Sequence, residues 1–491
     1  MGALSTRSGA APGLRGRPGA VLAAAGVIAF AAALAAYLAY AAAHPPHWTL
    51  YPVDLGVYQS GGLIVRHVPP LYNPHLATPL YSWPGYDGLH LKFTYPPFAA
   101  DVFALVSFIP WRVLPDLSVA VNIGLLAAAG WTSFRALGCR DRRVRAGATL
   151  LLTAAALWTE PVIRTLYLGQ VNLALMALIL WDLTQPDTRA SRWWKGAGVG
   201  IAAGVKLVPL IFIPYLLLTR RFRQAATAAA AFAVTVAIGW AVTPADSARW
   251  WLGGLFARGS RTGFVGWEGN QSLLGFITRL TGSVAGAQPI WLAVAVLAAA
   301  GGLAIATVLA RAGHELPAVL AAALTGDLVS PVSWDHHWVW IVPGLAAAAW
   351  YGLRAWQAGR RRLAAGCWAL AAGMYAVYAA WPDPLLGLRS SIAPFAFGLL
   401  WGPPNTDPSL YYRNGDQPWF FEYHWHGGQL LAGNAFLLGG LALLAVLAAA
   451  AARTLGGPGD GGGAGLPPRQ RLAPAAGAAD RARRAGARNL R

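Results

Sequence analysis

Apolar runs of about 20 residues recur from Val21 to Leu455, and polar residues gather in the segments between them. The first run, Val21–Ala43, is long enough to cross a bilayer as a helix. Backbone groups in lipid must be satisfied within the protein, and these runs are too long and too uniformly apolar for the alternating strands of a barrel. The pattern therefore predicts an all-α polytopic membrane protein with about 11 to 13 membrane segments, including short or re-entrant helices, in one membrane-embedded domain over residues 21–454.

The composition agrees with this architecture. The chain of 491 residues is 56% hydrophobic and 12% charged, whereas about 25% of the residues of a soluble domain are charged. Cys139 and Cys367 both fall near helix ends that are expected in the cytosol, so no disulfide framework is indicated. The net charge of +19 lies mostly in short loops between apolar runs, as the positive-inside rule describes, and does not indicate nucleic-acid binding.

The basic residues also predict the orientation. Arg15 and Arg17 precede the first run, so residues 1–20 are expected to form a basic tail in the cytosol. Residues 455–491 are rich in Gly, Ala, Pro and Arg and are predicted to form a disordered basic tail. If the later basic clusters also face the cytosol, the long polar and aromatic loops share the outer side. These loops are residues 44–95, 163–170, 244–287, 330–336 and 382–428.

Two segments do not fit simple spans. Residues 196–219 lie between two basic clusters and are too few for two full crossings, so we expect a pair of short helices that meet around Lys206 and Pro209. Residues 96–111 must start on the outer side, and so must the run that follows them. This segment is therefore re-entrant, or the predicted sidedness fails locally.

Lys206 stands inside the apolar stretch "GVKLVPLIFIPYLLL". A bare ammonium in such a place costs roughly 3 kcal/mol on insertion scales, so the residue is expected to have a function. A lysine here would bind an anion, either a phosphate or a carboxylate. The alternative is a structural lysine whose stem snorkels to the membrane surface.

The segment "SPVSWDHHWVW" holds two adjacent histidines, His336 and His337, beside Asp335. Neighbouring side chains on a helix point about 100° apart and the spacing supplies no third ligand, so a metal is not expected. An aromatic belt at the membrane interface explains the tryptophans but not the histidine pair. Donation to a phosphate, or the relay of a proton, suits the imidazoles better.

Further polar residues gather on the same side of the membrane. Asp54 follows the first run in "YPVDLGVYQSGG", and two prolines of "FTYPPFAA" open another segment. Each of these motifs also has an ordinary explanation as a helix cap. Together, amides and carboxylates beside Trp and Tyr are suited to sugar hydroxyls and sugar rings. The remaining candidates are Gln170 and Asn172 in "LYLGQVNLAL", and Glu268, Asn270 and Gln271 in "GWEGNQSLLG".

In this order, the motifs "VDLGVYQSGG", "FTYPP", "GQVN", "GVKLVP", "GNQS" and "SPVSWDHHW" resemble glycosyltransferase family 87 of the GT-C superfamily. The family comprises polyprenol-phosphate-mannose-dependent α-mannosyltransferases of actinobacterial lipid and lipoglycan assembly, and some relatives transfer arabinofuranose instead. The resemblance implies a multi-pass enzyme of the plasma membrane with its active site outside. Its partners would be a polyprenyl-phosphate-sugar donor, as a co-substrate, and a glycolipid or lipoglycan acceptor, with no cofactor, no metal and no nucleic acid.

The resemblance also assigns roles to residues. Asp54 would be the catalytic base, and Lys206, His336 and His337 would lie near the donor phosphate. The loop 382–428, with Asp383, Asp407, Glu422, His424 and His426, matches no motif of the family, so the acceptor stays open. The expected substrate-binding residues are Tyr58, Tyr95, Gln170, Asn172, Glu268, Asn270 and Gln271.

A single carboxylate is enough for the implied reaction. A base removes the proton of the acceptor hydroxyl, the anomeric centre inverts in one displacement, and the phosphate leaves without a general acid. A lipid-linked-sugar transporter is the rival class, and it would carry charges near the midplane of two related halves. Here the acidic residues gather at one surface and no repeat is visible, so only the break at Lys206 favours transport. A scaffold explains none of Asp54, Lys206 and the histidine pair.

Overall fold

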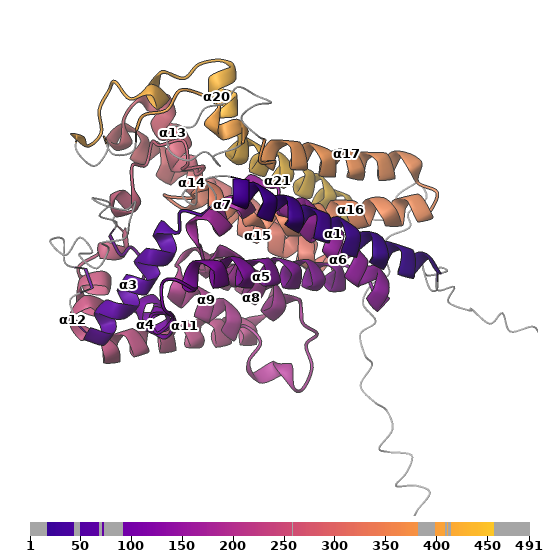
Figure 1. The fold of residues 1–491 in the computed structure, drawn as a ribbon, viewed down its shortest axis with the longest axis horizontal. Coiled ribbons are helices and arrows are strands. Elements are labelled where there is room, and N and C mark those ends of the chain that lie inside the picture. Colours follow the sequence, from indigo (N-terminus) through magenta and orange to yellow (C-terminus); the bar gives the residue numbers. More distant parts are fainter. Residues whose placement is uncertain are drawn as a thin grey trace, which may run out of the picture.

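The computed structural model describes residues 17–43, 50–67, 71–72, 92–257, 259–381, 398–407, 410 and 414–455. Within these ranges the chain is a bundle of helices without a named strand (Figure 1), and only two isolated bridges join extended backbone. The predicted tails lie largely outside the described residues, and so does Asp383. The α-helices are α1 (Arg17–Ala43), α3 (Val53–His67), α4 (Pro97–Val106), α5 (Leu114–Ala136), α6 (Arg142–Ala156), α7 (Glu160–Leu168), α8 (Asn172–Thr184), α9 (Ala197–Val205), α10 (Phe212–Leu218), α11 (Phe222–Val242), α12 (Pro244–Ser247), α13 (Leu273–Thr281), α14 (Val284–Arg311), α15 (Glu315–Val329), α16 (Ile341–Gln357), α17 (Arg361–Tyr378), α20 (Gly428–Ala432) and α21 (Ala435–Leu455).

Short turns of 3-10 or π helix connect several of these helices. The two that matter for the site are η2, which follows α9, and η6, which precedes α16. The full set is η1 (Ser191–Trp193), η2 (Val208–Ile211), η3 (Ala248–Leu252), η4 (Leu255–Ala257), η5 (Gly259–Thr262), η6 (Asp335–Trp340), η7 (Leu399–Trp401) and η8 (Phe421–His424).

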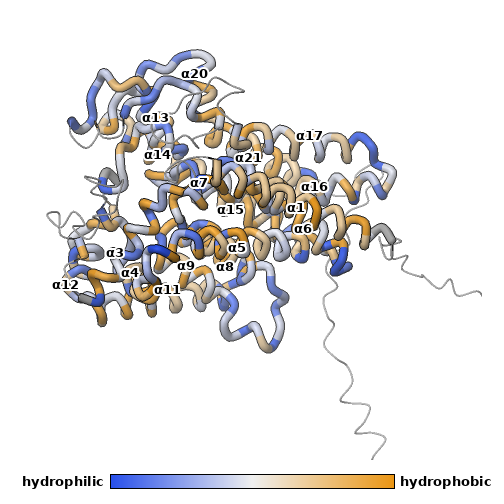
Figure 2. The backbone as a smooth tube through the Cα atoms, in the orientation of Figure 1, coloured by the Kyte–Doolittle hydropathy of each residue, from blue (hydrophilic) through white to orange (hydrophobic). Residues whose placement is uncertain are grey.

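Five helices of the described chain are long and apolar enough to cross a membrane, namely α1, α5, α11, α14 and α21. The pair α7 and α8 makes a sixth candidate, bent by 117° at its break. Figure 2 shows hydrophobic residues along the long helices and hydrophilic residues at their ends and in the loops. The predicted all-α polytopic membrane fold is confirmed, whereas the larger number of membrane segments stays a prediction.

The two segments that resisted simple spans are both short in the structure. Helix α9 ends at Val205 because Lys206 is extended, with φ −149° and ψ 129°, and Pro209 stands in the first turn of η2. The predicted pair of short helices around Lys206 is therefore confirmed. Helix α4 has 10 residues, about 15 Å at the helical rise of 1.5 Å, against a hydrocarbon core of about 30 Å. Its length favours the re-entrant version of that prediction.

Glycines set two close approaches that shape the site. Gly169, at the break between α7 and α8, has φ 70°, and a Cβ there would lie 2.5 Å from Leu55 Cβ. On α3, a Cβ at Gly61 would lie 2.4 Å from the ring of Phe93, and one at Gly62 would lie 2.3 Å from the Phe103 carbonyl oxygen. Only glycine permits contacts this close. The glycine pair behind Asp54 therefore lets α3 pack closely against α4 and against the segment before α4 that contains Phe93.

Candidate active site

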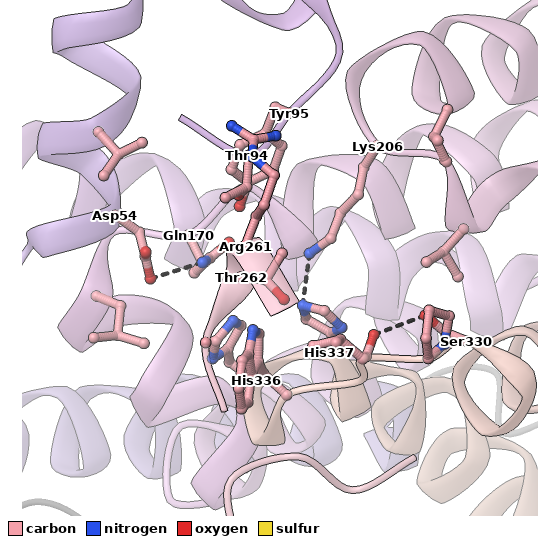
Figure 3. Close-up of a pocket in the computed structure, with 18 of the residues that line it drawn as sticks. Asp54, Thr94, Tyr95, Gln170, Lys206, Arg261, Thr262, Ser330, His336 and His337 are labelled. Atoms are coloured by element: carbon pink, nitrogen blue, oxygen red, sulfur yellow. Dashed lines mark hydrogen bonds between the residues drawn. The ribbon is translucent and has the colours of Figure 1, made fainter. Parts of the chain in front are cut away.

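The candidate site is a cavity of about 620 Å³ at the end of the bundle that carries α3, η2 and η6 (Figure 3). Its walls come from α3, the segment before α4, the α7–α8 break, the Lys206 turn, the end of α15, η6 and residues 261–267. Segments far apart in the sequence therefore meet in one space. Six of the predicted site residues line it, namely Asp54, Tyr95, Gln170, Lys206, His336 and His337.

Asp54 enters this cavity from the first turn of α3. Gln170 Nε2 donates to Asp54 Oδ2 at 2.7 Å, and Tyr58 donates its hydroxyl to Gln170 Oε1 at 2.7 Å. Tyr58 and Tyr95 share a further hydrogen bond between their hydroxyls at 2.9 Å. This chain of contacts fixes the carboxylate from one side. Burial raises the pKa of Asp54 from its ordinary value, although the nearby His336 and the hydrogen bond from Gln170 oppose the shift.

Lys206 reaches the same cavity from the opposite wall (Figure 3). Its Nζ lies 2.9 Å from Asn172 Oδ1 and 2.7 Å from His337 Nε2. An ammonium donates both hydrogen bonds, so His337 is neutral and carries its proton on Nδ1. The residue stands between α9 and η2, outside the candidate spans. Burial lowers the pKa of Lys206 to about 8, and Asp327 and Asp54 act against that shift.

His336 is oriented from behind by a carboxylate. Asp335 Oδ1 lies 2.9 Å from His336 Nδ1, and Asp335 Oδ2 accepts a hydrogen bond from Arg164 Nε at 2.8 Å. Burial alone would raise the pKa of Asp335, but Arg164 and His336 bring it below the ordinary value. His336 Nε2 and His337 Nδ1 are buried and have no hydrogen-bond partner in the described part of the protein. Both nitrogens are therefore available to a ligand in the cavity.

Five of the predicted substrate-binding residues do not line this cavity. Tyr58 is 1% exposed and acts through Gln170, as described above. Asn172 sits behind Lys206, and its Nδ2 donates to the His336 carbonyl at 2.8 Å. The structure therefore places these two behind the residues that line the wall. The other three are Glu268, Asn270 and Gln271.

The "GNQS" segment is a structural clamp in this fold. Asn270 Nδ2 donates to the Val265 carbonyl at 2.8 Å, and Asn270 Oδ1 accepts from Ser333 N at 2.9 Å. Gln271 Nε2 donates to the Gly433 carbonyl at 2.8 Å. These amides are satisfied by backbone groups and do not line the cavity, so their contact with substrate stays a prediction. Glu268 is 0% exposed, and burial and the nearby Glu422 raise its pKa well above the ordinary value.

The described part of loop 382–428 does not line the cavity, although Trp401 and Phe420 pack against its wall residues Trp267 and Phe264. Glu422 accepts the Thr406 hydroxyl at 2.8 Å. His424 Nε2 lies 2.9 Å from the Pro418 carbonyl, and His426 Nδ1 lies 3.1 Å from the His424 carbonyl.

Two arginines line the cavity that the sequence reading did not select. Arg164 lies in α7 and pairs with Asp335, and because that helix holds other polar residues, the cost of a charge in an apolar run did not single it out. Arg261 donates Nη2 to the Phe93 carbonyl at 2.9 Å, and its guanidinium lies 5.3 Å from the ring centre of Tyr72. It stands in η5, within a segment that the sequence predicts to be a loop, so no signal marked it. Among the described residues, no group of three or more His, Cys, Asp or Glu could hold a metal ion.

Comparison with known proteins gives consistent relatives. The model of Glycosyltransferase family 87 matches residues 93–331, which include Lys206 but neither Asp54 nor the histidine pair. A polyprenol-phosphate-mannose-dependent alpha-(1-2)-phosphatidylinositol pentamannoside mannosyltransferase of Mycobacterium tuberculosis is 38% identical over 296 residues, 59% of this chain and 64% of that protein. A polyprenol-phosphate-mannose-dependent alpha-(1-2)-phosphatidylinositol mannoside mannosyltransferase of the same species is 33% identical over 336 residues, 66% of this chain and 75% of that protein.

A third relative, from Mycolicibacterium smegmatis, carries the pentamannoside mannosyltransferase name and is 35% identical over 292 residues, 59% of this chain and 68% of that protein. The alignment thus spans slightly less than two thirds of the first relative and three quarters of the second. No solved structure matches this chain significantly.

Proposed function

Because this chain belongs to glycosyltransferase family 87, we propose that it transfers mannose from a polyprenyl phosphate to a glycolipid acceptor of the phosphatidylinositol mannoside type, at the outer face of the plasma membrane. The donor and acceptor classes follow from the names of the relatives. One observation supports the chemistry above all others. A carboxylate, Asp54, and an ammonium, Lys206, line the same cavity from opposite walls (Figure 3).

The donor is placed by charge and by apolar surface. Lys206 offers a compact positive charge to the phosphate, and the nitrogens His336 Nε2 and His337 Nδ1 can bind its other oxygens. Beside Lys206 the wall becomes apolar, as a polyprenyl chain requires. That stretch is formed by Val208, Leu210, Ile211, Val329 and Val332.

The reacting hydroxyl of the acceptor then lies next to Asp54. The carboxylate takes the proton of that hydroxyl, the acceptor oxygen bonds to the anomeric carbon, and the bond from that carbon to the phosphate oxygen breaks. The leaving phosphate keeps the electron pair, and Lys206 and the imidazoles stabilise its growing charge. The raised pKa of Asp54 makes it a stronger base than an exposed aspartate. A β-linked donor gives an α-linked product.

Two pairs of aromatic side chains in the cavity wall can pack against the sugar. Trp267 and Trp334 line the cavity with their ring centres 5.6 Å apart, and Tyr51 and Tyr167 form another pair at 6.0 Å. Flat aromatic faces pack against the apolar face of a pyranose ring, while the amide of Gln170 can bind hydroxyls.

The test is a transfer assay with purified protein in lipid. Polyprenyl-phosphate mannose and decaprenyl-phosphate arabinofuranose, both radiolabelled, are offered with a phosphatidylinositol mannoside acceptor, and the product linkage is determined. We expect mannose in an α-linkage. Transfer of arabinofuranose alone would replace the donor in the proposal. Movement of the lipid-linked sugar across vesicles without transfer would instead indicate the transporter.

A further inference from the structure

A second cavity, of about 40 Å³, also reaches Lys206. Lys206 and His337 line both cavities, so this smaller space adjoins the candidate site. The polar residues of its wall are Asn172, Lys206, Asp327 and His337, and the others are mostly apolar. Among these polar residues, Asp327 has no role in the proposed reaction.

Asp327 lies in the last turn of α15, whose sequence "ELPAVLAAALTGDLV" is otherwise apolar between its first residue and Thr325. The residue is 3% exposed, and its Oδ2 is buried without a hydrogen-bond partner in the described part of the protein. Burying a carboxylate without a partner is costly, so a counter-charge or a ligand is expected nearby. The only cation on the wall of this small cavity is Lys206.

We propose that Asp327 is a positioning residue for Lys206, which keeps that side chain an ammonium ion aimed at the donor phosphate. The inference deepens the proposed function and rests on it. A cavity of about 40 Å³ is large enough for a water, which would bridge the carboxylate and the ammonium.

The hydrogen bonds of Lys206 leave room for this role. An ammonium has three donors, and two of them reach Asn172 Oδ1 and His337 Nε2. Both of these partners are neutral, so neither supplies the negative charge that a buried ammonium needs. The third donor can point to the bridging water when no donor lipid is bound, and to the phosphate when it is.

The timing of the reaction distinguishes Asp327 from Asp54. Both carboxylates act on Lys206 by raising its pKa, with Asp327 the stronger. Asp54 becomes neutral when it accepts the acceptor's proton. The phosphate charge develops at that same moment, when Lys206 must be positive. Asp327 takes no part in the proton transfer, so the step itself leaves its protonation unchanged. Burial raises the pKa of Asp327 well above its ordinary value, and Lys206 opposes that shift, so the two groups support each other's charge.

Other titratable groups also face this pair and belong in any account of its pH dependence. They are Asp54 on α3, Tyr95 before α4 with its ring centre 6.0 Å from Lys206 Nζ, His336 and His337 on η6, and Tyr378 on α17, which faces Asp327.

The sequence offers a direct way to observe the charge of Lys206. The chain holds only three lysines, Lys92, Lys195 and Lys206, so selective 15N or 13C labelling of lysine gives three signals that Lys206→Arg assigns. We expect the Lys206 signal of the wild-type protein to titrate near pH 8. In Asp327→Asn it should titrate about one pH unit or more lower, which corresponds to a tenfold or greater loss of the ammonium form.

The same variant should change the kinetics in one parameter. Asp327→Asn is expected to raise the KM for the donor about tenfold above neutral pH, with little change in the KM for the acceptor. Asp327→Glu, which keeps the charge, should recover part of this loss. Asp101→Asn is a matched control, since Asp101 on α4 is a carboxylate whose oxygens also lack partners and which lines neither cavity.

A double variant separates positioning from structure. In a Lys206→Gln background, Asp327→Asn should add no further loss of affinity for polyprenyl phosphate. An added loss there would overturn the inference, and so would an unchanged Lys206 titration in Asp327→Asn. Asp327→Ser takes its place if Asp327→Asn does not fold. The lysine titration needs no transfer, so it still decides the inference if wild-type protein transfers no mannose and the proposed function fails.

Discussion

Two polar segments lie at the same end of the bundle and use their side chains in opposite ways. In η6, His336 and His337 each keep one buried ring nitrogen without a partner among the described residues, and both line the cavity. In the segment of Asn270 and Gln271, the amides are bound to backbone groups, and neither residue reaches the cavity. Polar residue type alone does not distinguish a site from a clamp. The difference lies in whether the protein itself satisfies the polar atoms.

The difference has a physical basis. A backbone turn inside a membrane protein exposes N–H and C=O groups that water cannot reach, so an amide side chain nearby is recruited to satisfy them. The imidazoles of His336 and His337 meet no such demand in the described part of the chain, so one ring nitrogen of each stays available to a ligand. The predictions below test this division from the largest expected effect to the smallest.

Asp54 on the cavity side should show the largest effect. Asp54→Asn keeps the size and the contact with Gln170 but removes the basicity, so transfer should fall by roughly a hundredfold or more while the protein still folds. Turnover is measured with saturating donor and acceptor. Asp116→Asn, at an exposed carboxylate in the first turn of α5, is the control and should transfer normally. Near-normal turnover of Asp54→Asn would contradict the role of Asp54 as the base and would indicate that it only caps a helix at the membrane interface.

Substitution of Lys206 should have the next largest effect, and it should change the KM for the donor only. Lys206→Ala removes a buried charge from the expected phosphate, which costs about 2–5 kcal/mol, so the KM for the donor should rise by about 30-fold or more. The KM for the acceptor should change little. Lys206→Arg should recover only part of the donor affinity, because the planar guanidinium group does not replace the compact ammonium between Asn172 and His337. A snorkelling lysine would predict the reverse, with lower yield and normal kinetics in the protein that folds.

Much of this division could be anticipated from the sequence. Apolar run lengths predicted the helical membrane fold, and the cost of a charge in lipid singled out Lys206. The same rule would have found Asp327, whose helix is apolar from Leu316 to Leu324, whereas Arg164 shares its helix with Glu160 and Thr165. Asp327 was missed because it falls in no motif with other polar residues.

Other parts could not be anticipated. An amide such as Gln271 binds a backbone carbonyl as readily as a sugar hydroxyl. Only the folded chain shows that the carbonyl of Gly433, far along the sequence, accepts its hydrogen bond. The convergence of α3, η2 and η6 on one cavity depends equally on contacts over long sequence separations. No local pattern encodes such contacts.

The pH dependence of transfer should reflect the titration of Asp54 on one wall of the cavity and of Lys206 on the other. Because Lys206 has a pKa of about 8, its ammonium form is present below that pH, and donor affinity should be lost as the pH rises through about 8. Because the pKa of Asp54 is raised, its basic form should be lost at a higher pH than for an ordinary aspartate as the pH falls. The profile of kcat/KM for the donor is therefore expected to be bell-shaped. Lys206→Arg should move the alkaline limb upward, and a limb that stays in place would assign it to another group.

The clamp should show the smallest effect on catalysis. Gln271 donates to the Glu268 and Gly433 carbonyls and accepts from the Phe436 and Leu437 amides at the start of α21. Gln271→Ala therefore leaves four buried backbone groups with fewer partners. Each unsatisfied group costs about 1–3 kcal/mol, so the thermal unfolding temperature should fall measurably. The KM values for donor and acceptor should stay within about twofold in the protein that folds, because no atom of Gln271 lines the cavity.

Gln170→Ala is the matched comparison, because Gln170 is an amide on the cavity side. This variant should lower kcat, because the hydrogen bond that positions Asp54 is lost. If Gln271→Ala instead raised the KM for the acceptor with unchanged unfolding, the "GNQS" segment would be a binding element, and the division between the two segments would fail.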